Sequence, residues 1–132
     1  QTDIMFSLQM MEHLTDPIRF LYNLSKNNVS EYMLFTVPYV SKSRVGLKHL
    51  RQKDGRIVSP EECHIFELSP SDWELVCKFS GWEVIERDIY LQYPPFHLLS
   101  FTKPLWRIYD FEGFCGIFLK RKFDLTRQYT GW

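Results

Sequence analysis

The sequence has little cysteine, no net charge and no long apolar run, and each shortage excludes a class of protein. Its cysteines, Cys63, Cys77 and Cys115, are odd in number and form no Cys-x-x-Cys pair. This argues against a disulfide scaffold or a zinc site and indicates a reducing, cytoplasmic compartment. Because 16 basic residues balance 16 acidic ones, we expect neither nucleic acid nor membrane as a partner. No apolar run approaches the roughly 18 residues of a membrane helix.

What the sequence does contain is typical of a globular domain. Apolar residues make up 45% of the 132 residues and aromatic residues 17%, which is enough for one modest core. The sequence opens on Gln1, without a signal-peptide pattern, and residues 3–8 already have the apolar character of a strand. We therefore expect the chain to begin inside a domain.

A strand, a helix and a second strand are predicted within the first 38 residues. The apolar runs 3–8 and 32–37 are typical of strands buried on both faces of a parallel sheet. Between them, Asp16 is a candidate N-cap with Pro17 at the first helical position, and Asn27-Asn28 can end the helix in left-handed geometry. This βαβ pattern predicts two parallel strands.

The rest of the sequence predicts one more helix and two more strands. Residues 39–62 form a long polar connection, and a helix is expected to begin at Ser69-Pro70 and to end at Gly81. Strands are predicted over residues 82–90 and 113–119, and residues from Lys120 onward read as a charged tail. The aromatic stretch 98–109 is helical in pattern but is interrupted by Pro104.

Several short motifs occur in an order that resembles a known family. They are Asp3-Ile-Met-Phe-Ser7, Glu12-His13, Asp16-Pro17, Val37-Pro38, His64, Leu68-Ser69-Pro70 and Gly81-Trp82-Glu83-Val84. Together they resemble the S-adenosylmethionine-dependent methyltransferases of the type 11 and type 23 groups, which are class I, Rossmann-like enzymes. The resemblance covers residues 3 to about 93 well and the last strand more loosely.

The resemblance implies an α/β fold: the C-terminal portion of a Rossmann-like methyltransferase sheet, flanked by helices, with mostly parallel strands and an antiparallel last strand. The family's glycine-rich turn and its ribose-binding acid have no counterpart here and would lie before Gln1. Residues 1–132 are therefore expected to be a partial methyltransferase domain that lacks the N-terminal cofactor-binding half. We expect the strand over residues 3–8 to pair with a missing N-terminal segment or with a second copy.

The resemblance also places candidate residues around the cofactor S-adenosylmethionine. Ser7, Leu8 and Gln9 would face its methionine end, although Leu8 could equally be core and Gln9 a loop residue. His13 and His64 are the candidate catalytic residues, since histidine can take up a proton near neutral pH. Glu12 would border the acceptor, or would simply cap the following turn. A metal site made of Glu12, His13 and His64 is an alternative, but no familiar ligand spacing supports it and we predict no metal.

Further candidates for binding the acceptor lie in two loops. Tyr39 follows Val37-Pro38, and the basic stretch after it contains Arg44 and Arg51, whose guanidinium groups suit phosphate or carboxylate. A solvated basic loop is the alternative. Tyr93, Trp106 and Arg107 lie between the last two strands and could contact the acceptor, although core packing or a subunit contact would explain them equally.

The sequence therefore predicts a methyltransferase that acts on a small, polar or anionic acceptor, with this chain supplying the acceptor side. The alternative from another class is a non-catalytic, degenerate or split methyltransferase subunit that serves as an interaction module. A nucleotide-sugar enzyme on a similar sheet fits the Glu-His and Val-Pro motifs less well.

Overall fold

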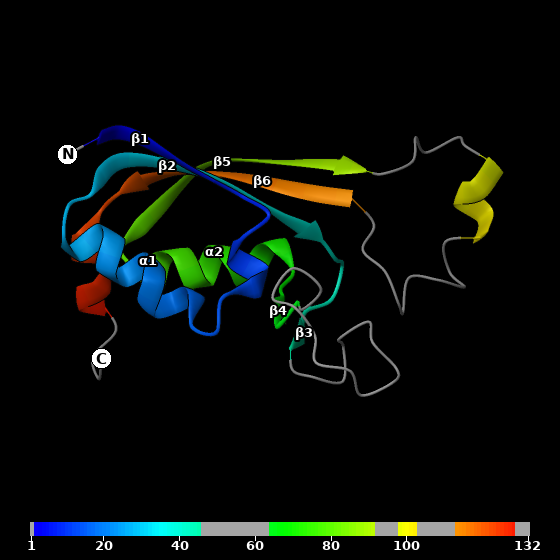
Figure 1. Ribbon diagram of the computed structural model, residues 1–132, viewed down its shortest axis with the longest axis horizontal. Coiled ribbons are helices and arrows are strands. Elements are labelled where there is room, and N and C mark those ends of the chain that lie inside the picture. Colours follow the sequence, from blue (N-terminus) through cyan, green and yellow to red (C-terminus); the bar gives the residue numbers. More distant parts are fainter. Residues whose placement is uncertain (1, 46–63, 92–97, 103–112, 129–132) are drawn as a thin grey trace.

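A computed structural model describes residues 2–45, 64–91, 98–102 and 113–128. In this part of the chain a four-stranded sheet carries both α-helices on one face (Figure 1). The elements are, in chain order, β1 (Thr2–Leu8), η1 (Met11–His13), α1 (Pro17–Lys26), β2 (Ser30–Tyr39), β3 (Arg44–Val45), β4 (Phe66–Glu67), α2 (Pro70–Phe79), β5 (Trp82–Leu91), η4 (Leu98–Thr102), β6 (Gly113–Arg121) and η5 (Phe123–Gln128).

The sheet has the strand order β1-β2-β6-β5. Strand β1 pairs in parallel with β2, so that Ile4 lies opposite Tyr32. The last strand, β6, is antiparallel to both β2 and β5, and β5 therefore runs in the same direction as β1 and β2. The predicted α/β sheet, with mostly parallel strands and an antiparallel last strand, is confirmed.

Both α-helices begin and end at the residues that the sequence indicates. The Asp16 carboxylate accepts the backbone N–H of Arg19 at 2.9 Å and caps α1, while Asn28 has a positive φ of 52° just beyond its end. The Ser69 hydroxyl caps α2, and Gly81 follows with a φ of 82°. These local signals, a polar cap before a proline and a left-handed residue after the last turn, were sufficient to predict both helices.

The hydrophobic core lies between the sheet and the two helices. Trp73 of α2 packs against Phe35 of β2 with ring centroids 5.6 Å apart. The indole N–H of Trp82, at the start of β5, donates to the backbone carbonyl of Leu21 in α1 at 2.9 Å. The fully buried side chains include Met11, Leu21, Met33, Phe35, Trp73, Cys77, Trp82, Ile117 and Leu119. This packing fixes the carboxyl ends of β1 and β2 relative to α2.

The prediction that β1 is buried on both faces is wrong for the described part of the chain. Its alternate residues Ile4, Phe6 and Leu8 are 41%, 60% and 64% exposed, whereas Ser7 is buried. The reason is that α1 and α2 lie on the same side of the sheet (Figure 1), so only one face of β1 is covered among the described residues. We call Ile4, Phe6 and Leu8 the open face of β1.

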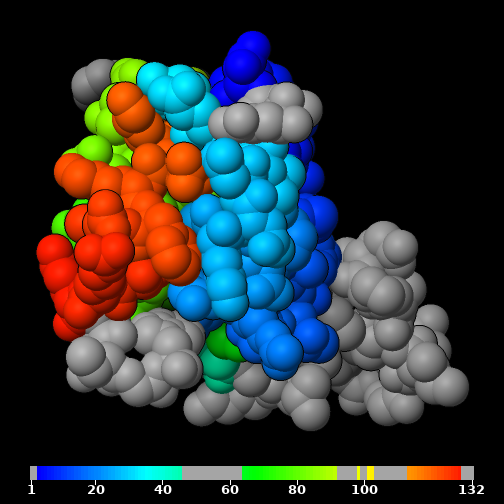
Figure 2. Space-filling model, turned by 90° about the vertical axis from the view of Figure 1, so that its left-hand side faces the viewer, coloured from blue at the N-terminus to red at the C-terminus, as the bar shows by residue number. Residues whose placement is uncertain are grey.

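Up to Gln128, the segment predicted as a charged tail forms regular structure. Strand β6 continues to Arg121, and η5 follows with Thr126 buried against the fold. The ring of Phe123 in η5 lies 5.6 Å from the ring of Tyr22 in α1, and Figure 2 shows η5 beside α1 at this end of the molecule. Phe123 and Thr126 pack against the fold between exposed charged residues, and the many charges of the segment therefore misled the prediction.

One further segment differs from its prediction, and another is described only in part. The connection expected over residues 39–62 contains the end of β2 and the short strand β3, which pairs with β4 in an antiparallel, two-stranded sheet. Of the aromatic stretch 98–109, the structure describes η4, and the remainder lies outside the described residues.

Candidate functional site

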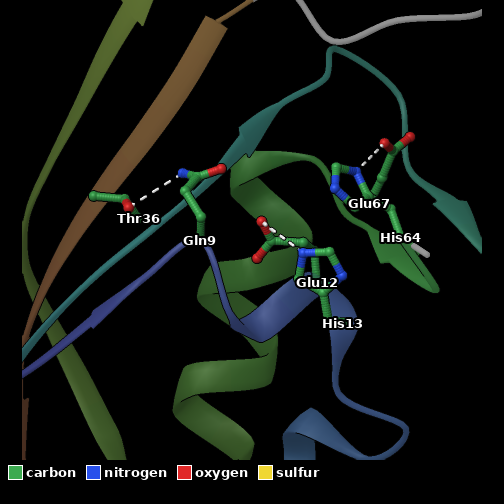
Figure 3. Close-up of polar contacts among 6 residues, drawn as sticks. All are labelled: Gln9, Glu12, His13, Thr36, His64 and Glu67. Carbon is green, nitrogen blue, oxygen red and sulfur yellow. Dashed lines mark hydrogen bonds and ion pairs between the residues drawn. The ribbon is translucent and has the colours of Figure 1, made fainter. Parts of the chain in front are cut away.

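The candidate site begins where β1 ends. The chain leaves the strand through Gln9, which has a positive φ of 51°, and turns into η1. The backbone N–H of Gln9 donates to the carbonyl of Thr36 at 3.0 Å, and its side-chain Nε2 donates to the Thr36 hydroxyl at 3.2 Å. This double contact joins the carboxyl ends of the parallel strands β1 and β2 (Figure 3). Ligands of open α/β sheets bind beyond this edge.

Glu12, in η1, is a fully buried acid. The residue is 0% exposed, and neither carboxylate oxygen has a hydrogen-bond partner among the described residues. The Nε2 atom of the neighbouring His13 lies 3.9 Å from Oε1 of Glu12. Burial raises the pKa of Glu12, and the neighbouring His13 and His64 oppose this only in part. A carboxyl group in this setting favours a bound proton or a bound cation.

His64 joins this pair from a segment 51 positions further along the sequence. The N–H of Ile65, the next residue, donates to the backbone carbonyl of Glu12 at 2.9 Å. The rings of His13 and His64 meet edge to face, with centroids 4.8 Å apart and an interplanar angle of 78°. One ligand atom from each of Glu12, His13 and His64 lies within 4.8 Å of the others. We call these three residues the Glu-His-His cluster.

Glu67 is a component of the site that sequence reasoning missed. Its Oε1 lies 2.8 Å from Nδ1 of His64, and its Oε2 forms an ion pair with a guanidinium nitrogen of Arg44. Glu67 is 4% exposed, and the pairing of β3 with β4 places Arg44 directly opposite it. Because a carboxylate paired with Arg44 can only accept, Nδ1 of His64 carries the proton in this contact.

This arrangement gives Arg44 a position that differs from a solvated loop. Its side chain is 15% exposed and reaches Glu67, so it orients the carboxylate that in turn orients His64. The signal for Glu67 was available as an acid three residues after His64, but only the register of β3 and β4 shows that Arg44 and His64 share it.

Three other predicted residues lie near the carboxyl ends of β1 and β2. Ser7 is buried, with a hydroxyl that has no hydrogen-bond partner in the described part of the chain, while Leu8 belongs to the open face. Tyr39 ends β2 opposite Gly113 and packs against the core. The remaining predicted residues lie outside the described ones: Arg51, Tyr93, Trp106 and Arg107.

A comparison with solved structures identifies the fold. The chain is similar to a protein described as a candidate methyltransferase, solved in a complex with the Trm112 methyltransferase activator of Haloferax volcanii. The TM-score is 0.55 at 13% sequence identity, over 91% of this chain and 54% of the other. The fold is methyltransferase-like. The chain thus spans about half the length of the structure that it matches.

The other comparisons add no family. Neither a protein-family profile nor a curated protein matches the sequence. Within the ranges that the structure describes, no helix has both the length and the apolar character needed to cross a membrane. The methyltransferase-like fold therefore rests on the arrangement of strands and helices, and the type 11 or type 23 grouping remains a prediction from the sequence motifs.

Proposed function

We propose that this chain is the acceptor-side part of an S-adenosylmethionine-dependent methyltransferase whose substrate is a small, polar or anionic molecule. One observation carries the proposal. The Glu-His-His cluster lies beyond the carboxyl ends of two parallel strands in a methyltransferase-like fold, which is where an α/β sheet of this kind binds its ligands.

The residues at the end of β1 fit the methionine part of the cofactor. The buried hydroxyl of Ser7 has no partner among the described residues and could receive a hydrogen bond from a polar ligand. Gln9 is held by Thr36 through Nε2, which leaves its amide oxygen available as an acceptor for an ammonium group. Leu8 belongs to the open face of β1, and we therefore assign this role to Ser7 and Gln9.

When bound, S-adenosylmethionine supplies a methyl group that is already activated on a sulfonium. The acceptor atom forms a bond to the methyl carbon while the carbon–sulfur bond breaks and its electron pair stays on sulfur. The task of this chain is to hold the acceptor in line and to take the proton that it loses. His13 and His64 are the groups that could take it, and Glu67 would stabilise the charge that His64 acquires.

The test is a methyl-transfer assay on the full-length product of the gene. We expect label from methyl-labelled S-adenosylmethionine to appear in the low-molecular-mass fraction of a cell extract. A His13→Gln variant should lower the rate by about 100-fold or more, as expected for loss of general base catalysis. Glu83→Gln, in an exposed ion pair with Lys122, is the control and should not change the rate. Failure of the full-length protein to bind the cofactor would rule out the proposal.

The second candidate function is a non-catalytic interaction module. It is favoured by the open face of β1, which exposes three adjacent apolar side chains, and by the protein partner that is present in the similar structure. Pairing with a segment of the methyltransferase-like domain, or with a second copy, would cover this face. The two functions differ in one measurement, since an interaction module would bind its partner without transferring a methyl group.

A further inference from the structure

The Glu-His-His cluster has the composition of a metal site. Glu12 offers a carboxylate oxygen, and His13 and His64 each offer an imidazole nitrogen, with all three atoms within 4.8 Å of one another. Two of these residues are neighbours in η1, and the backbone bond from Ile65 to Glu12 fixes the third beside them. Figure 3 shows the three side chains converging from η1 and from the segment before β4.

Among the described residues, the carboxylate of Glu12 lacks the hydrogen-bond partners that a buried acid needs. It is completely buried, and both oxygens are without a hydrogen bond among the described residues. Buried charges in proteins are paired or coordinate metals, because removing them from water is otherwise costly. A divalent cation would satisfy the carboxylate and both imidazoles together.

We propose that Glu12, His13 and His64 bind a divalent transition-metal cation. Two imidazoles and one carboxylate are a donor set suited to zinc, cobalt, iron or manganese, whereas magnesium and calcium favour oxygen ligands. Three protein ligands leave at least one position open for water or substrate. With bonds of about 2.1 Å, ligand atoms around a tetrahedral ion lie about 3.4 Å apart, so small side-chain rotations would close the cluster onto the cation.

The residues around the cluster support this assignment. Metal-binding histidines usually donate their second ring N–H to a carboxylate, which fixes the tautomer and the ring orientation. His64 has this contact, since its Nδ1 lies 2.8 Å from Glu67, and its Nε2 is thereby left as the acceptor nitrogen. Arg44 holds the other oxygen of Glu67. Glu67 is thus a positioning residue for His64, not a ligand.

A cation at this place would lie on the acceptor side of the site. Bound to an acceptor hydroxyl, it would lower the pKa of that group and favour its deprotonation. In that case His13 and His64 act as ligands, and the proton leaves to solvent or to another base. This extension rests on the proposed function, but binding of the cation does not, and the two can fail separately.

The experiment is a titration of the purified, chelator-treated protein with Co²⁺, followed by visible absorption, and with Zn²⁺ and Mg²⁺, followed by calorimetry. We expect one equivalent of Co²⁺ with d–d bands, micromolar or tighter binding of Zn²⁺, and much weaker binding of Mg²⁺. His64→Gln and Glu12→Gln should each weaken Zn²⁺ binding by about 100-fold or more. Glu67→Gln should weaken it by about 10- to 100-fold, as for other outer-shell partners.

The controls separate a local effect from misfolding. Glu83→Gln should bind Zn²⁺ as the unchanged protein does, and circular dichroism should show that each variant is folded. If Glu12→Gln fails to fold, the Zn²⁺ affinity of His64→Gln and of His13→Gln tests the proposal instead, because both residues are partly exposed. Absence of a one-equivalent Co²⁺ site, equal affinity for Mg²⁺, or Zn²⁺ binding that survives loss of both histidines would overturn the proposal. Methyl transfer that persists in excess chelator would overturn only the catalytic extension.

Discussion

The Nδ1 atom of His64 lies 2.8 Å from Oε1 of Glu67, and the other oxygen of that carboxylate is paired with Arg44. Arg44 and Glu67 come from the short strands β3 and β4, which pair across a long segment of sequence. The orientation of His64 therefore depends on a two-stranded sheet that is separate from the main one. The pairing of β3 with β4 thus determines how the His64 ring is oriented in the candidate site.

The Arg44–Glu67 pair can be tested by its contribution to stability. Arg44→Gln removes the guanidinium partner of the buried Glu67 carboxylate, and we expect a loss of about 1–3 kcal/mol in the free energy of unfolding. Urea denaturation followed by circular dichroism measures this loss. Lys42→Gln, at an exposed position in the same segment, is the control and should stay within about 0.5 kcal/mol. Equal stability of the two variants would mean that the pair is not formed in solution.

Gly81 should not tolerate a side chain. Its φ is 82°, and an added Cβ would lie 2.9 Å from the Ser25 hydroxyl and 3.1 Å from the backbone of Phe123. Gly81→Ala therefore combines a strained backbone with a clash, and we expect it to destabilise the protein by at least about 1–3 kcal/mol. Gly116→Ala is the matched control, because the nearest atom to its added Cβ is 3.9 Å away. Thermal unfolding of both variants would show whether only the first lowers the midpoint.

The two buried cysteines should be unreactive in the native protein. Burial raises the pKa of Cys115 to about 11 and raises that of Cys77 as well, so little thiolate forms at pH 8. In a Cys63→Ser variant, Ellman's reagent should react with neither thiol until the protein is unfolded in urea, when both should react. If one equivalent of thiol reacted rapidly in the native state, one of the two cysteines would not be buried as described.

The same pKa predicts a dependence of stability on pH. The Cys115 pKa is raised from 9.0 in the unfolded chain to about 11 in the native state. The contribution of this group to stability is therefore complete below about pH 9 and falls as the pH rises toward 11. Urea denaturation of the unchanged protein and of Cys115→Ala at pH 8 and pH 10.5 should give a difference in stability that narrows at the higher pH. A constant difference would show that Cys115 does not titrate as described.

The open face of β1 should favour association. Ile4, Phe6 and Leu8 form an exposed apolar row on this strand, and covering it would remove apolar area from water. We expect light scattering of the 132-residue chain to rise above the monomer mass with concentration, and Phe6→Asp to suppress this rise. Phe101→Asp, at another exposed phenylalanine, is the control and should associate as the unchanged chain does. If the chain stayed monomeric at all concentrations, the open face of β1 would not drive association.

The parts of this protein that could be predicted from sequence are those fixed by neighbouring residues. Asp16 before Pro17, and Ser69 before Pro70, set the starts of both helices because capping is local. The burial of β1 could not be predicted in this way, since it depends on which face of the sheet the helices cover. His64 lies beside Glu12 because the backbone N–H of Ile65 donates to the carbonyl of Glu12, 53 positions earlier. A contact between residues so far apart cannot be predicted from the spacing of residues in a motif.

The position of β6 has a consequence for the order of folding. This strand is the last of the described strands, yet it lies in the sheet between β2 and β5 and pairs with both. During synthesis, β2 and β5 are complete before β6 exists. Until β6 is made, the backbone groups of β2 and β5 that will pair with it have no partner strand. Pairings so distant in sequence carry a large loop-closure cost and are slow to form. We therefore expect β6 to close the sheet in a late step, and a nascent chain to need protection of those two edges until Gly113–Arg121 has emerged.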